Sequence, residues 1–129
     1  MRGVGVAVLG LLVACEATTP AHPREGILNQ APTTLRNRND VDNLAGRYLY
    51  LDGILLEAPP PHKGTHAVLG LETRLEIWTP NIGTFMAGAP WADYYGRLVR
   101  VGGILRATSK DIPGYAGPVI EIHEFGVIP

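Results

Sequence analysis

Two pairs of residues have the side chains and the spacing to hold a metal ion. His62 and His66 flank a Lys-Gly-Thr tripeptide in a loop after three prolines, and Glu121 and His123 share one face of an expected strand. An H-x3-H spacing makes a ligand pair on a helix, but this loop fixes no third ligand. Two imidazoles without supporting partners bind a metal weakly. We therefore interpret these histidines as exposed side chains and predict no metal and no other cofactor.

Sequence motifs of the common catalytic sites are absent. The chain has no GxSxG, Walker loop, GxGxxG or HExxH pattern. Its Asp and Glu residues are scattered singly, as is typical of solvated faces, and no residues form a nucleophile, base and orienting group even in outline. We predict that the protein is not an enzyme. An enzyme with an unrecognised site is the alternative, which a pocket of perturbed carboxylates would favour.

The only cysteine, Cys15, follows a pattern typical of secretion signals. A short cationic start at residues 1–3 precedes an apolar run over residues 4–14, which is too short for a membrane span of roughly 20 residues. The tetrapeptide Leu12-Val13-Ala14-Cys15 resembles the lipobox of bacterial lipoproteins. A stray or buried cysteine after a plain signal is the alternative interpretation.

The lipobox resemblance implies both a location in the cell and a lipid anchor. A signal peptide of residues 1–14 would be removed, and Cys15 would carry a diacylglyceryl group with acyl chains such as palmitate. Two or three acyl chains hold a protein in a bilayer where one would be marginal. Glu16, in place of Asp, implies the outer membrane. The expected location is the cell envelope, with the chain facing the periplasm.

Residues 15–43 are expected to be the lipidated N-terminus and a flexible tether. Residues 16–33 are rich in Thr, Pro, Ala and Asn, with little to bury. As a coil of that length, they would span on the order of 25 Å. A brief helix is predicted from Asn37 to Leu44, with two aspartates near its start.

A β-strand pattern begins near residue 46 and continues to the end of the chain. With 16 Gly and 11 Pro, the 129-residue sequence favours short strands and turns. Residues 46–55 align with residues 96–105 without a gap, and each segment alternates with period two. Gly53 and Gly103 lie inside these strand patterns, where a glycine indicates a bulge or a sharp bend. Shorter strand patterns cover residues 67–71, 74–79 and 119–125.

This order of elements resembles the OB-fold. The expected domain, residues 44–129, is an all-β, five-stranded Greek-key barrel with one short helix between strands three and four, placed at residues 90–95. The repeated G-R-x-x-x-x-x-G-x-L phrase, with Pro-Trp before its second copy, is also similar to small OB-like domains of bacterial envelope lipoproteins. An SH3-like small barrel or a five-stranded sandwich is the alternative.

The OB resemblance implies a binding face on strands two and three, rimmed by residues 59–66 and 108–117. Period two turns Trp78 outward, where it would stack on a ring of a ligand. Tyr115 and His66 lie in the rim loops and complete the predicted ligand-binding residues. In the alternative, Trp78 packs under the following loop as a structural residue. Trp91 is expected to plug the bottom of the barrel.

We predict a membrane-tethered module that binds or assembles a protein, glycan or small ligand of the envelope. The expected partners are the lipid bilayer, through Cys15, and an envelope protein or glycan. A single-stranded nucleic-acid-binding OB domain is the alternative. The charge of the chain argues against a nucleic-acid role, because the sequence has 11 Lys and Arg and 12 Asp and Glu. Binding through counterion release needs clustered cations.

Overall fold

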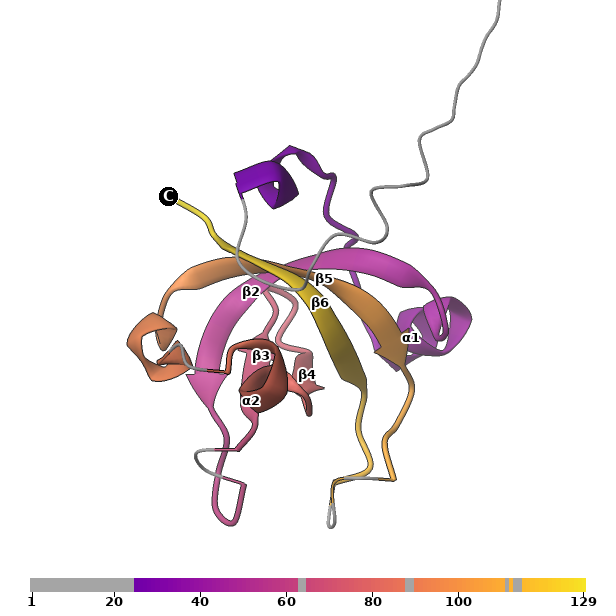
Figure 1. The fold of residues 1–129 in the computed structure, drawn as a ribbon. Helices are drawn as coiled ribbons and strands as arrows, with labels where there is room; N and C mark the ends of the chain where they lie inside the picture. The colour runs from indigo at the N-terminus through magenta and orange to yellow at the C-terminus, as the bar shows by residue number, and fades with distance from the viewer. Residues whose placement is uncertain (1–24, 63–64, 88–89, 111, 113–114) are drawn as a thin grey trace, which may run out of the picture.

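The computed structural model describes residues 25–62, 65–87, 90–110, 112 and 115–129. Cys15 and the signal pattern lie outside these residues, so the lipoprotein assignment stays a prediction. Figure 1 shows the described chain as a small barrel of strands with short helices around it. The elements are η2 (Glu25–Asn29), α1 (Arg38–Leu44), β2 (Tyr48–Glu57), β3 (Ala67–Gly70), β4 (Glu76–Thr79), α2 (Ile82–Phe85), η3 (Trp91–Tyr94), β5 (Leu98–Arg106) and β6 (Val119–Val127).

The strands close into one barrel in the order β2-β3-β4-β6-β5. Neighbouring strands are antiparallel except β4 and β6, which are parallel and meet at Trp78 and Val119. The last strand therefore lies between the third and the fourth, which makes the connectivity a Greek key rather than a meander. This arrangement confirms the prediction of a small all-β, OB-like barrel.

Two glycines lie inside the long strands at the positions that the repeat predicts. Gly53 lies where β2 changes its partner from β5 to β3, and a Cβ there would be 2.8 Å from the carbonyl oxygen of Gly70. The β5–β6 register shifts between Gly102 and Gly103, where a Cβ on Gly103 would overlap the carbonyl oxygen of Glu121. Both sites require glycine because another strand passes too close for a side chain.

The core fills the barrel with the inward side chains of every strand. In β2 buried and partly exposed residues alternate from Leu49 to Leu55, as period two demands for a half-buried strand. Phe125 of β6 is the largest of the fully buried side chains. Because burial follows the alternation in β2, the strand register and the core specify each other. The residues of the barrel strands in this core that are 0% exposed are Leu51, Leu55, Ala67, Leu69, Ile77, Val99, Val101, Leu105 and Ile120.

The described part of the expected tether lies against the barrel instead of standing clear of it. Ile27 of η2 is 0% exposed, and Leu35 is buried in the barrel core. The Arg100 guanidinium bonds to Asp52 and donates to the carbonyl oxygens of Leu28 and Gln30. The packed unit therefore includes described residues that precede residue 44, among them Ile27 and Leu35. These apolar residues are too sparse for a sequence pattern, and only tertiary contacts bury them.

The short helix α1 forms as predicted. Its N-cap is Asn37, whose side chain accepts a hydrogen bond of 3.0 Å from the backbone N–H of Asp40. Such a cap satisfies one of the free N–H groups at a helix start. Val41 turns into the core, which anchors the helix at the edge of β5.

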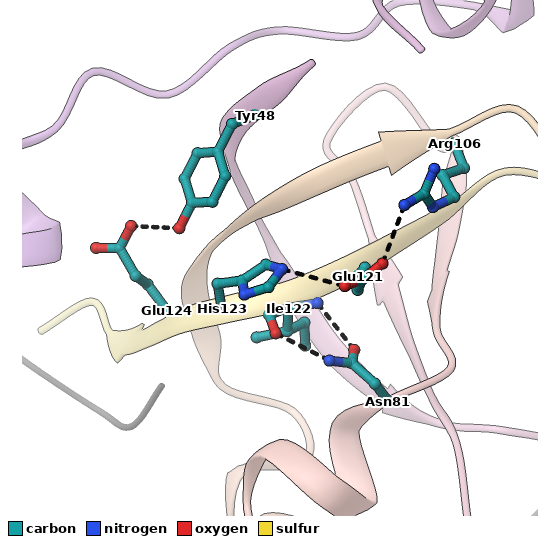
Figure 2. A network of polar contacts seen from close by, with 7 residues as sticks. All are labelled: Tyr48, Asn81, Arg106, Glu121, Ile122, His123 and Glu124. Carbon is teal, nitrogen blue, oxygen red and sulfur yellow. Dashed lines mark hydrogen bonds and ion pairs between the residues drawn. The ribbon is translucent and has the colours of Figure 1, made fainter. Parts of the chain in front are cut away.

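Two short helices connect β4 to β5. The turn predicted at residues 90–95 is η3, and Trp91 packs against the core from there while remaining partly exposed. The helix α2 lies between β4 and η3. Asn81, just before α2, makes two hydrogen bonds to the backbone of Ile122 and ties the helix to β6 (Figure 2). Within the described ranges, no helix is long and apolar enough to cross a membrane.

Candidate binding site

Two loops project from the same end of the barrel (Figure 1). One joins β2 to β3 over residues 58–66, and the other joins β5 to β6 over residues 107–118. These are the loops that the OB resemblance predicts as rims. Their described residues contribute side chains to the outward face of β4, so segments far apart in the sequence meet there.

The side chains of Ile77 and Trp78 point to opposite sides of β4. Ile77 belongs to the barrel core, whereas Trp78 belongs to a second apolar cluster outside the barrel. The period-two register therefore turns Trp78 outward, as predicted. The second cluster, called here the outer cluster, consists of Ala58, Val68, Trp78, Ile112 and Val119, with Tyr115 packed against it.

Four aromatic rings meet at the outer cluster, and we call His62, His66, Trp78 and Tyr115 the ring cluster. Trp78 and Tyr115 stack with centroids 4.3 Å apart and an interplanar angle of 22°. The imidazoles of His62 and His66 stack at 5.1 Å, and His62 meets Trp78 edge-on at 5.4 Å. The three ligand-binding residues predicted from the sequence thus lie together, and His62 joins them.

Trp78 is not an open stacking platform. Its side chain is only 6% exposed, because Tyr115 covers one side and the outer cluster surrounds the rest. That Trp78 itself receives a ligand ring stays a prediction, although so small an exposed area leaves little surface for stacking. The structural alternative fits better, although the cover comes from the β2–β3 and β5–β6 loops and not from the loop that follows β4. Trp78 supports the other rings, which form the outer layer.

Tyr115 is held in a fixed orientation over Trp78. Its hydroxyl donates a hydrogen bond of 2.8 Å to the carbonyl oxygen of Pro118. A Cβ on Gly117 would overlap that hydroxyl, so glycine lets the tyrosine fold back on its own loop. Burial raises the pKa of the Tyr115 phenol above its usual value. The residue therefore presents one ring face and a protonated hydroxyl at neutral pH.

Backbone hydrogen bonds hold the two loop histidines close together. The backbone N–H groups of Thr65 and His66 both bond to the carbonyl oxygen of His62, at 3.1 Å. Both imidazoles are half-buried, and the buried His66 Nδ1 atom has no hydrogen-bond partner among the described residues. The described chain contains no group of three or more His, Cys, Asp or Glu side chains suited to a metal ion.

Comparisons with known proteins identify no family. No protein-family model matches the chain, and no curated protein matches it. Two OBodies, each bound to hen egg-white lysozyme, are 16% and 17% identical to it with TM-scores of 0.44 and 0.45, covering 76% of this chain and 95% and 97% of their own. Aspartyl tRNA synthetase from Entamoeba histolytica is 13% identical with a TM-score of 0.48, covering 93% of this chain and 24% of the synthetase. The OB-like assignment rests on the strand order of the barrel itself.

Proposed function

We propose that the protein is a lipid-anchored envelope module whose barrel binds a partner through the ring cluster, without catalysis. The observation that carries this proposal is the meeting of two separate loops over Trp78. A buried tryptophan holds two half-buried imidazoles and the face of one tyrosine in fixed positions. Aromatic side chains fixed in advance lose little conformational entropy on binding.

The partner in this proposal is a protein, a glycan or a small ligand of the envelope. Ring faces bind apolar groups and sugar rings without needing positive charge. The whole chain has a formal net charge of −1. The same charge disfavours a polyanionic ligand, because such ligands are held by clustered cations.

The anchor in this proposal is Cys15, lipidated at the outer membrane. The support is the sequence pattern of cationic start, short apolar run and lipobox. Metabolic labelling with a clickable fatty acid tests it. The wild-type chain should carry label, and Cys15→Ala should lose both label and processing. Label that persists in the variant would refute the assignment.

The binding role is tested by recovering the tagged full chain from crosslinked envelopes. We expect the double variant His62→Ala, His66→Ala to lose the co-purified partner while the barrel stays folded. Asp42→Ala, on the exposed surface of α1, is the matched control and should retain the partner. Equal recovery with all three proteins would contradict the role of the ring cluster. Tight, salt-sensitive binding of a single-stranded oligonucleotide would instead favour a nucleic-acid function.

A further inference from the structure

The outer face of β2, β5 and β6 carries a second group of polar and aromatic side chains, away from the ring cluster. Its position depends on the bulge between β5 and β6. Gly102 pairs with Glu124 and Gly103 pairs with Ile122, which leaves His123 without a partner residue on β5. Consecutive residues His123 and Glu124 are therefore both partly exposed, while Ile122 stays in the core. Bulges re-aim side chains in this way and are frequent next to functional sites.

Two tyrosines of β2 reach across β5 to one carboxylate of β6. Tyr48 and Tyr50 donate hydrogen bonds of 2.5 Å and 2.8 Å to the same atom, Glu124 Oε2. The strand between them permits this contact, because a Cβ on Gly102 would be 2.6 Å from Cε1 of Tyr50. Tyr50, Gly102 and Glu124 thus form one row across the three strands. Hydrogen bonds to a charged acceptor are the stronger kind, so this row fixes the tyrosine rings.

Tyr48 remains 46% exposed although its hydroxyl is bonded. Its ring lies 5.9 Å from the His123 imidazole, and His123 Nε2 is 3.2 Å from Glu121 Oε2. On its other oxygen, Glu121 accepts a hydrogen bond of 3.2 Å from Arg106 (Figure 2). The exposed ring is therefore set among fixed polar groups. We call Tyr48, Tyr50, Arg106, Glu121, His123 and Glu124 the tyrosine–glutamate patch.

The charges of the patch favour a cation. Two carboxylates face one guanidinium, so the patch carries a net negative charge when His123 is neutral. Both tyrosine bonds go to Glu124 Oε2, and no bond from a described residue reaches Glu124 Oε1. An acceptor oxygen with a negative charge therefore lies beside an exposed aromatic ring. A planar guanidinium stacks on such a ring and donates to such an oxygen, which an ammonium does less well.

We propose that the tyrosine–glutamate patch binds an arginine side chain of a partner protein, with the guanidinium over Tyr48 and bonded to Glu124 Oε1. This surface shares no residue with the ring cluster. It allows the module to hold two partners, or two parts of one partner, at once.

The test is an NMR titration of the 15N-labelled, lipidated full chain in detergent micelles. The probe is N-acetyl-arginine amide, with N-acetyl-lysine amide and N-acetyl-glutamine amide as matched controls. We expect saturable shifts of the Tyr48, His123 and Glu124 amide signals with arginine, at millimolar concentration. Glu124→Gln should weaken this binding about fivefold, as expected for loss of an exposed ion pair. Glu72→Gln, at an exposed position of the β3–β4 turn, should leave it unchanged.

Four results would overturn the proposal. One is the absence of saturable shifts with arginine. Another is an equal response to the glutamine probe, which would remove the role of charge. The third is unchanged arginine binding in the variant Tyr48→Leu. This variant removes the aromatic ring, whereas Glu124→Gln retains the ring and removes the charge. Shifts at the same signals with N-acetylglucosamine but not with arginine would assign the patch to sugars and would also overturn it.

Discussion

Replacing Trp78 by alanine separates a supporting role from ligand contact. Trp78 is 6% exposed, and its ring touches Tyr115 and the outer cluster. Truncating a buried tryptophan to alanine costs about 3–5 kcal/mol, part of which is the cavity that remains. For a domain of this size, that loss corresponds to a fall in melting temperature on the order of 15 °C. We therefore expect Trp78→Ala to destabilise the fold strongly, with any loss of binding as a consequence.

The assay is thermal and urea unfolding of the full chain in a mild detergent, followed by far-UV circular dichroism. Trp78→Phe retains a ring over the outer cluster and should cost only about 1–2 kcal/mol. Leu98→Ala is the matched control, because Leu98 is 42% exposed and its truncation should change stability by less than about 0.5 kcal/mol. If Trp78→Ala has the same melting temperature and urea midpoint as the Leu98→Ala control, the Trp78 ring is not packed as described. The account of the outer cluster then fails.

Further predictions concern the bulge, the N-terminal segment and a tyrosine. Gly103→Val should destabilise by more than about 1 kcal/mol, because its side chain would overlap the backbone of β6; an unchanged melting temperature would mean that the strands do not pass so closely. Arg100→Met should lower the free energy of unfolding by about 1–3 kcal/mol. It should also speed amide exchange at Thr33, whose N–H bonds to the carbonyl oxygen of Tyr50, and slow exchange there would contradict the account. Burial raises the pKa of Tyr115, so the folded state keeps this proton after the unfolded state has lost it. Stability should therefore fall as pH rises above about 10, whereas a Tyr115→Phe variant should show less of this fall.

Local patterns predicted the barrel well because side-chain alternation and glycines within strands are features of short stretches of sequence. Alternation located β2 and β5, and a single glycine inside a strand pattern predicted the bulge at Gly103. The segment near Ile27 and Leu35 was assigned to a tether because isolated apolar residues in polar surroundings carry no period. Their burial arises from contacts with distant strands.

The candidate site was predictable in its members but not in its layering. Period two turned Trp78 outward, and the loop positions of His66 and Tyr115 brought all three residues together. That Tyr115 lies on Trp78 depends on a loop folding back across 37 residues of sequence, which no local pattern records. The tyrosine–glutamate patch was missed because the bulge changes which residues of β6 face outward. The Gly102-Gly103 doublet was the one sequence signal for it.

The most direct test of the proposed binding role is site-specific photocrosslinking in intact cells. A photoreactive amino acid at position 62, beside the stacked rings of the ring cluster, should give a discrete adduct with an envelope partner. The adduct should be lost when Tyr115→Ala is added to the same chain. The same photoreactive residue at position 42 of α1 should not produce it. An identical adduct from both positions, or none from position 62 in a folded chain, would contradict the claim that the ring cluster is the binding site.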